Sequence, residues 1–238
     1  MTKINAFLKI PSTFTAEIMG QAGFDFITID MQHGLIDYQI MVSMLQSLGK
    51  SSAQTLVRIP WNEPSIIMRV LDAGALGIIC PMINSKEEAI SFVKATLYPP
   101  DGIRSFGPIR AKLAGTYSTI SQTNQDIIKF AMIETQDAIE NLEEIAATDG
   151  LTGLYVGPSD LSISLGLERI ADFFDNHFIT ILKRIIETAK QYQLTTATQV
   201  YDVQQAKVAI ALGFDIVTPM DDSSLLENAV REKLSLLR

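Results

Sequence analysis

The chain has 238 residues, of which 47% are hydrophobic and 19% are charged, and its formal net charge is −8. This composition is typical of a soluble globular protein and excludes a disordered chain, and the negative charge argues against nucleic acid or an anionic membrane as a partner. There is no apolar stretch of about 20 residues and no signal-peptide pattern, so we expect a cytoplasmic protein. A single cysteine, Cys80, excludes an internal disulfide, and we expect it to be a buried core residue.

Short apolar runs bounded by turn residues predict eight buried strands. In chain order they cover residues 4–10, 25–30, 54–59, 76–80, 129–134, 152–157, 194–199 and 214–218. Most runs are followed by a helix-like stretch, and this alternation predicts one α/β domain, a (β/α)8 TIM barrel, over residues 1–238. A doubly wound open sheet is the runner-up, which the lack of a GxGxxG motif after the first strand disfavours.

Helical spacing of apolar residues follows the second to fifth strands. The predicted helices cover residues 37–49, 62–75, 84–97 and 135–150. Asn62 is the expected N-cap of the second helix, and Asn84 or Ser85 that of the third.

Residues 97–128 form the irregular part of the chain, since their first half is rich in proline and glycine. A long connection of this kind in a compact domain is typical of a functional loop. Short helices over 108–115 and 119–129 would interrupt it.

Ionisable residues stand at the ends of several predicted strands, where a TIM barrel holds its chemistry. These residues are Asp30, His33, Arg58, Glu134 and Asp160. Two acids, an Asp/His pair and an arginine on different strands indicate a metal-assisted reaction on an anionic substrate.

Glu134 and Asp160 end neighbouring strands, so their carboxylates can converge on a hard divalent cation such as Mg²⁺ or Mn²⁺. N-capping of the helix that follows each acid is the alternative interpretation. Arg58 either faces the barrel mouth, where it would bind a carboxylate or a developing enolate oxygen, or pairs with Asp30 or Asp72.

His33 follows Asp30 by three positions, and a carboxylate that orients an imidazole is a common acid/base arrangement. The segment Gly157-Pro158-Ser159-Asp160 predicts a helix start whose free N–H groups bind anionic oxygens. The stretches after strands seven and eight lack the glycines of the usual barrel phosphate site, which argues against a phosphorylated substrate.

Several segments together resemble the HpcH/HpaI aldolase family, metal-dependent (class II) pyruvate aldolases of the phosphoenolpyruvate/pyruvate barrel superfamily that act on 4-hydroxy-2-oxo acids. They are GFDFITIDMQH, VRIP, LDAGALGIICP, YPPDGIRS, MIET and NLEEIAATDGLTGLYVGPSDLSISLG, and they extend over nearly the whole chain.

The resemblance implies a role for each candidate. Glu134 and Asp160 would bind the metal (Mg²⁺, Mn²⁺ or Co²⁺), and Arg58 the keto oxygen. His33 and Asp30 would form the acid/base dyad. The turn from Gly157 and Pro158 would bring the backbone of Ser159 and Asp160 to the pyruvate carboxylate. The family also forms homohexamers, trimers of dimers, through swapped C-terminal helices, here residues 223–237.

Three positions depart from the family pattern. Gln32 stands where glutamate is usual, Met132 where glutamine is usual, and Ser105 where glycine is usual. Methionine cannot orient a water as an amide does, and serine is less able to adopt a backbone conformation reserved for glycine. These changes put the substrate range and the rate in question.

The expected reaction is reversible cleavage of a 4-hydroxy-2-oxo acid to pyruvate and an aldehyde. His33, directly or through a water, would take the proton of the 4-hydroxyl, and the aldehyde half would meet residues 98–106 and the end of strand seven.

Three alternatives stay open. A Schiff-base aldolase needs a lysine at a strand end, and only Lys9, for which the sequence offers no partner, comes near. A citramalyl- or malyl-CoA-type lyase would use the same barrel. A degenerate barrel would bind a 2-oxo acid without turnover.

Overall fold

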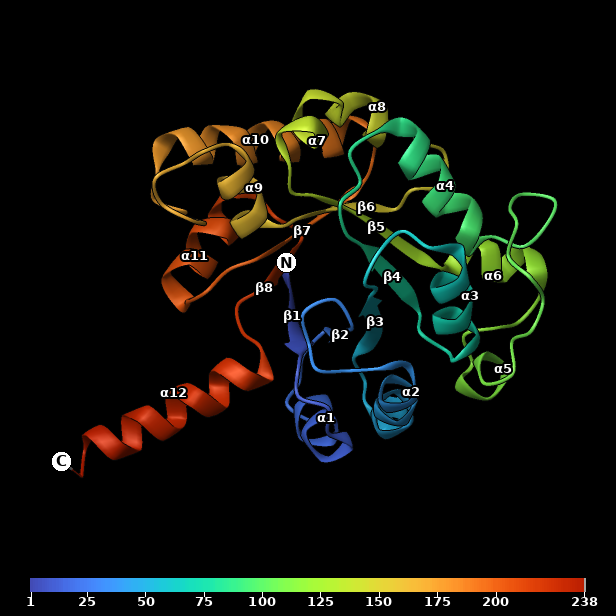
Figure 1. Ribbon diagram of the computed structural model, residues 1–238, viewed down its shortest axis with the longest axis horizontal. Coiled ribbons are helices and arrows are strands. Elements are labelled where there is room, and N and C mark those ends of the chain that lie inside the picture. The colour runs from blue at the N-terminus through green and yellow to red at the C-terminus, as the bar shows by residue number, and fades with distance from the viewer. Residues whose placement is uncertain (238) are drawn as a thin grey trace.

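Parallel strands close into a barrel in which each strand pairs with its neighbours in the sequence, from β1 to β8 and back to β1 (Figure 1). The computed structural model describes residues 1–237. The strands are β1 (Lys3–Leu8), β2 (Phe26–Asp30), β3 (Gln54–Arg58), β4 (Gly77–Cys80), β5 (Ile128–Ile133), β6 (Gly153–Val156), β7 (Thr195–Gln199) and β8 (Ile216–Thr218). The predicted TIM barrel is confirmed and the open sheet is wrong; Arg238, the last residue of the predicted domain, lies outside the described residues.

Helices surround the barrel, and the last one, α12, extends away from it (Figure 1). They are α1 (Thr13–Gly20), α2 (Tyr38–Ser47), the 3-10 turn η1 (Leu48–Lys50), α3 (Pro64–Asp72), α4 (Lys86–Thr96), α5 (Ala111–Ala114), α6 (Ile120–Asp126), α7 (Gln136–Glu140), α8 (Leu142–Ala146), α9 (Pro158–Ser164), α10 (Asn176–Gln191), α11 (Val203–Leu212) and α12 (Asp222–Ser235). Within residues 1–237, no helix is long and apolar enough to cross a bilayer.

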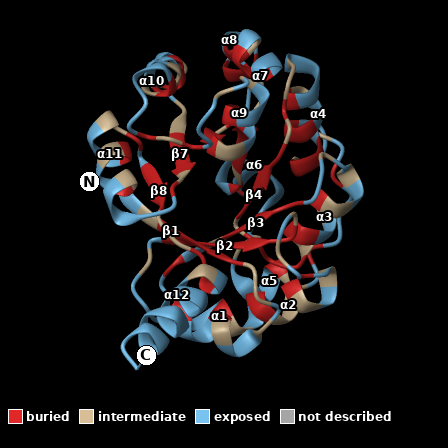
Figure 2. Cartoon of the chain, turned by 60° about the vertical axis from the view of Figure 1, so that its left-hand side comes forward, coloured by how far each residue is buried: buried red, intermediate tan, exposed pale blue. Residues whose placement is uncertain are grey.

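The strands are buried on both faces, because one face lines the barrel interior and the other packs under the helices (Figure 2). The interior cluster consists of Phe7, Phe26, Leu56, Ile79, Phe130, Met132, Tyr155, Ala197 and Ile216. This double burial explains why the sequence shows continuous apolar runs. Cys80, at the end of β4, is buried as predicted.

Two helix predictions need correction. The helix predicted over 62–75 is α3, which begins at Pro64 with Glu63 at the N-cap, while the Asn62 side chain donates instead to the Glu88 carbonyl 3.0 Å away. The helix predicted over 135–150 is interrupted at Asn141, whose side-chain amide donates to the Asn84 carbonyl at 2.8 Å. In both cases an asparagine bonds to a neighbouring segment, which the sequence pattern does not reveal.

Alternation along the strands continues at the carboxyl end of the barrel. In β2, Phe26 faces the interior and Asp30 lies four residues further on the same face; in β5, Met132 faces the interior and Glu134 follows it. The inward positions are therefore mostly apolar below the carboxyl end, apart from a hydrogen-bonded polar group around Asn5, Thr28 and Thr218, and they are ionisable at the carboxyl end itself.

Candidate functional site

A cavity of about 300 Å³ opens at the carboxyl ends of the strands. Its lining consists of Lys9, His33, Arg58, Met132, Glu134, Gly157, Pro158, Ser159, Asp160, Gln199 and Tyr201. All the predicted site residues are in this set except Asp30, which is fully buried and bonded to Arg58. The structure thus brings together candidates that are widely separated in the sequence.

Asp30 and Arg58 are register partners on adjacent strands and form a two-pronged ion pair. Arg58 donates from Nε to Oδ1 at 2.9 Å and from Nη2 to Oδ2 at 2.6 Å. Burial raises the pKa of Asp30, but the bonds and charge of Arg58 outweigh it and hold the pKa below its usual value. The two expected arrangements of Arg58 therefore coexist, since it pairs with Asp30 and also faces the cavity.

His33 lines the cavity, but its hydrogen bond to Asp30 comes from its backbone N–H. The His33 N–H donates to Asp30 Oδ1 at 3.1 Å, as does the N–H of Gln32. That oxygen already accepts from Arg58, and no bond joins the His33 ring to Asp30 in the described chain. Asp30 thus fixes Arg58 and the turn that carries His33, and the side-chain dyad stays a prediction.

Glu134 is the buried acid of the site. Its Oε1 accepts from the Met82 N–H at 2.7 Å, and Met82 holds a left-handed φ of 55° that is uncommon for a residue with a side chain. Burial above all, and then the charge of Asp160, raise the pKa of Glu134 to about 7, while the Met82 N–H and Arg58 act in the opposite direction.

Gly157 makes room for this carboxylate. A Cβ on Gly157 would lie only 2.3 Å from Glu134 Oε2, so no other residue fits there unchanged. Asp160, in the first turn of α9, is exposed above it. The capping alternative is wrong for Glu134, because Thr135 is the N-cap of α7. It is also wrong for Asp160, because Gly157 is at the N-cap position of α9 and Asp160 lies inside the first turn.

The two acids fit a divalent cation. A buried carboxylate with a raised pKa beside a second carboxylate is an electrostatically costly pair that a cation would relieve. Ions such as Mg²⁺ often take only one or two protein carboxylates and leave other positions to substrate and water.

Sequence reasoning missed the role of Lys9 and did not name Gln199 or Tyr201. The statement that Lys9 lacks a partner is wrong, since its Nζ lies 3.1 Å from Asp221 Oδ2 in an ion pair. Tyr201, whose hydroxyl bonds to that of Ser159, follows β7. The sequence did predict that residues near the end of strand seven meet the substrate, and Gln199 and Tyr201 lie there and line the cavity.

Known proteins resemble this chain over most of its length. The sequence profile of the HpcH/HpaI aldolase/citrate lyase family matches residues 3–226. The chain belongs to this family. The predicted recognition and the predicted enzyme class, a carbon–carbon lyase, are therefore confirmed.

Individual members agree with this placement. A hydroxypyruvate/pyruvate aldolase of Rhizorhabdus wittichii is 35% identical over 96% of this chain and 91% of its own length. A 5-keto-4-deoxy-D-glucarate aldolase of Escherichia coli is 38% identical over 69% of this chain and 65% of its own. The crystal structure of a family protein from Burkholderia cenocepacia superposes with a TM-score of 0.92 at 30% identity, covering 100% of this chain and 95% of the other.

The three departures from the family pattern have different surroundings. Met132 is buried and lines the cavity beneath Gly157. The Gln32 side-chain oxygen is buried without a hydrogen-bond partner in residues 1–237. Ser105 is exposed and has no left-handed φ, so the expected conflict with a glycine-only backbone does not arise.

The loop expected to meet the aldehyde does not line this cavity. Residues 98–106 are absent from its lining, and Arg104 instead pairs with Asp72 of α3 at 2.7 Å and lies 4.4 Å from the Tyr98 ring centroid. Within one chain the loop is thus fixed to the helical layer.

Proposed function

We propose that this HpcH/HpaI family member is a divalent-metal-dependent aldolase that reversibly cleaves a 4-hydroxy-2-oxo acid to pyruvate and an aldehyde. The observation that carries the proposal is the buried Glu134 beside Asp160, at one cavity with Arg58. The names of the two relatives given above, a hydroxypyruvate/pyruvate aldolase and a 5-keto-4-deoxy-D-glucarate aldolase, support the same reaction class.

Glu134 and Asp160 would hold Mg²⁺, Mn²⁺ or Co²⁺. When bound, such a cation acts as a Lewis acid that stabilises negative charge on the keto and carboxylate oxygens of the substrate. The first-turn N–H groups of Ser159 and Asp160, next to these acids, would bind the pyruvate carboxylate together with the turn at Gly157 and Pro158.

Arg58 would donate to the keto oxygen. Asp30 occupies Nε and one hydrogen of Nη2, which leaves Nη1 for the substrate and fixes the plane of the guanidinium. Donors held in advance at the point where an enolate charge develops stabilise the transition state without reorganisation.

His33 would accept the proton of the 4-hydroxyl, since it is exposed and lines the cavity. The O–H electrons then form the aldehyde carbonyl, the C3–C4 bond breaks, and its electron pair moves through C3 to the keto oxygen as an enolate beside Arg58. Protonation at C3 completes pyruvate, so atoms and charge balance.

We also propose a homo-oligomer, a hexamer as in the family resemblance. The support is α12, which leaves the barrel and exposes Leu226, Val230 and Leu234 (Figures 1 and 2). An apolar helix face of this kind is typical of a subunit interface. The cytoplasmic location stays a prediction.

A retro-aldol screen tests the proposal. Purified protein is stripped with EDTA and offered 4-hydroxy-2-oxo acids with Mg²⁺, Mn²⁺ or Co²⁺, and released pyruvate is measured. We expect cleavage only with added metal. Full activity after EDTA, a borohydride-trapped lysine adduct with pyruvate, turnover of CoA thioesters alone, or binding of pyruvate without any cleavage would each contradict it.

A further inference from the structure

The left-handed turn at Met82 depends on the contacts around it. Met82 has a φ of 55°, and its backbone N–H donates to Glu134 Oε1 at 2.7 Å. A residue with a side chain keeps such a conformation only where neighbouring contacts hold it, because the backbone alone favours negative φ. Ile83, the next residue, is fully buried in the core. The contacts that hold this turn therefore also hold the hydrogen bond to the Glu134 carboxylate.

Asn84, two residues after Met82, is fixed through three of its polar groups. Its N–H donates to Glu88 Oε2 at 2.6 Å, and its carbonyl accepts from the Asn141 side chain at 2.8 Å. Its side-chain Oδ1 accepts from the Thr135 hydroxyl. The chain that follows the left-handed residue is thus bonded to two other segments.

Thr135 connects Asn84 to the segment that carries Glu134, because Thr135 directly follows Glu134 at the end of β5. The Thr135 hydroxyl donates to Asn84 and also accepts from the Ala138 N–H at 3.0 Å, as the N-cap of α7. Glu134 is therefore held twice by the loop after β4. The Met82 N–H binds its carboxylate, and the bond between Asn84 and Thr135 holds the adjoining backbone.

The same turn after β5 is bonded to α9. The Gln136 N–H donates to Ser164 Oγ at 2.8 Å, and α9 carries Asp160 in its first turn. The loop after β4, the turn after β5 and α9 are thus joined by hydrogen bonds behind the two acids. Of the residues that the structure describes, neither Asn84 nor Thr135 lines the cavity.

We propose that Asn84 is a positioning residue of the metal site, which holds the Met82 N–H and the Glu134 carboxylate in the arrangement that binds the cation. This inference rests on the proposed function. Groups that fix a metal-binding side chain from behind orient it for the metal, and their removal lowers the affinity for the ion. Asn84 acts through Glu134 and touches neither the cation nor the substrate.

Mn²⁺ titration of Asn84→Ala, followed by electron paramagnetic resonance, tests this role. The substitution removes the bond to Thr135 and keeps the backbone bonds of residue 84. We expect the dissociation constant for Mn²⁺ to rise about tenfold, because the turn at Met82 and the Glu134 carboxylate are less well fixed.

Asn124→Ala is the matched control. Asn124 also fixes a loop through its side chain, which accepts from the Tyr98 N–H at 2.8 Å and donates to the Tyr98 carbonyl at 3.1 Å, but it does not line the cavity. Both variants should lose stability in denaturant titrations without metal, and only Asn84→Ala should lose Mn²⁺ affinity. Unchanged affinity in Asn84→Ala, or an equal loss in both variants, would overturn the inference.

Substitutions of Thr135 test the same bond from its other side. Thr135→Val removes the hydroxyl and should weaken Mn²⁺ binding about as much as Asn84→Ala, whereas Thr135→Ser keeps the hydroxyl and should bind Mn²⁺ like the wild type. The double variant of Asn84→Ala and Thr135→Val should bind no more weakly than either single variant, because both lose one shared bond. Losses that multiply in the double variant would contradict a shared role.

The wild-type titration separates this inference from the proposed function. Mn²⁺ bound with equal affinity by the wild type, Asn84→Ala and Thr135→Val defeats the role of Asn84 alone. A wild-type protein that binds no Mn²⁺ defeats the proposed function and the inference with it.

Discussion

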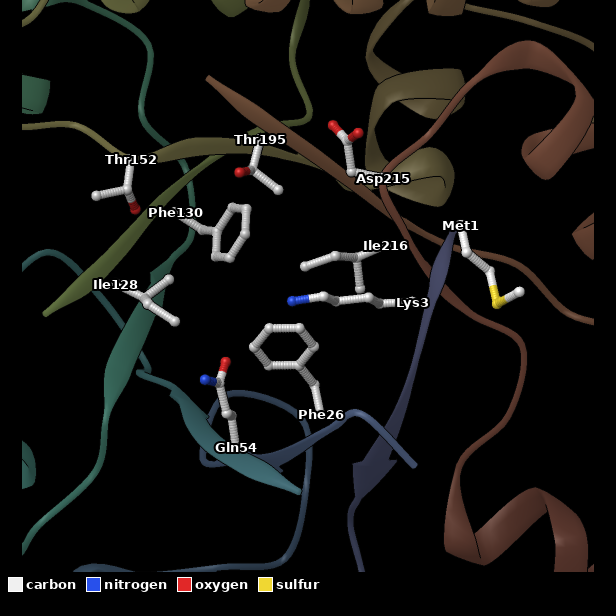
Figure 3. Close-up of a pocket in the computed structure, with 10 residues that line it drawn as sticks. All are labelled: Met1, Lys3, Phe26, Gln54, Ile128, Phe130, Thr152, Thr195, Asp215 and Ile216. Atoms are coloured by element: carbon white, nitrogen blue, oxygen red, sulfur yellow. The ribbon is translucent and has the colours of Figure 1, made fainter. Parts of the chain in front are cut away.

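The two ends of the barrel have cavities of similar size but different chemistry. The amino end holds about 340 Å³, lined by polar and apolar side chains that include Lys3, Gln54 and Asp215, and Lys3 lies over the Phe26 ring (Figure 3). The carboxyl end holds about 300 Å³. Cavity volume therefore does not distinguish the candidate site from the other end.

Buried charge distinguishes them. At the amino end Lys3 and Asp215 are exposed, whereas at the carboxyl end Arg58 and Glu134 are 5% and 2% exposed. Burying ionisable groups costs stability, and such groups are retained where they act. Met82, whose backbone N–H donates to Glu134, has a left-handed φ, and this uncommon backbone conformation is a further local cost in stability at the same end.

The largest expected effect is at Glu134. Glu134→Gln keeps the shape but removes the charge, so we expect kcat to fall by about 10³-fold or more, because the cation and the enolate lose their support. Retro-aldol kinetics at saturating Mg²⁺ measure it. Asp215→Asn, at the amino end, is the control and should stay within about twofold of wild type; an equal effect of both variants would remove the distinction between the ends.

Arg58→Lys should have the next largest effect. Lysine keeps the charge but cannot bond to both oxygens of Asp30, so we expect a loss of about 10²-fold in kcat and a loss of about 1–3 kcal/mol in the free energy of unfolding. Denaturant titration and kinetics together check this. Arg110→Lys, whose guanidinium bonds to two backbone carbonyls away from the cavity, should affect only stability.

Gly157→Ala tests the packing around Glu134. The added methyl group would meet the carboxylate at 2.3 Å, so Glu134 must move, and we expect activity to fall by about 10-fold to 100-fold. In the control, Gly49→Ala, a Cβ has nothing within 4 Å, and activity should be unchanged. Wild-type activity in Gly157→Ala would mean that the position of Glu134 is not critical.

The smallest effect concerns Lys129, a buried cation on the same strand as Glu134 but far from the cavity. Its Nζ donates to the Ile127 carbonyl at 2.6 Å, and burial lowers its pKa to about 8. Because the unfolded chain binds this proton more tightly, stability rises with pH between about 8 and the unfolded pKa near 10.5.

Relative to Lys129→Met, the wild type should gain roughly 2 kcal/mol in the free energy of unfolding from pH 7 to pH 9.5. Denaturant titrations of both proteins at the two pH values measure this difference, with activity of the variant as a check that the site is intact. A difference that does not depend on pH would contradict the lowered pKa.

The fold could be predicted because its signal is local. Each strand is buried on both faces, and this produces the apolar runs from which all eight strands were located. The helix interruption at Asn141 could not be found in this way, since it depends on a contact with Asn84, 57 positions away.

The site was predictable in its members but not in its contacts. Strand ends indicated Arg58, Glu134 and Asp160, yet only the register of β2 and β3 shows that Arg58 bonds to Asp30. Lys9 could have been found by extending the alternation of β1 by one step, but its partner Asp221 is 212 positions away.

Mn²⁺ binding followed by electron paramagnetic resonance tests the central claim most directly, because it needs no substrate. We predict one bound Mn²⁺ per wild-type chain, and weaker binding by at least about tenfold in both Glu134→Gln and Asp160→Asn. Wild-type affinity in both variants would contradict a shared metal site at the carboxyl end of the barrel.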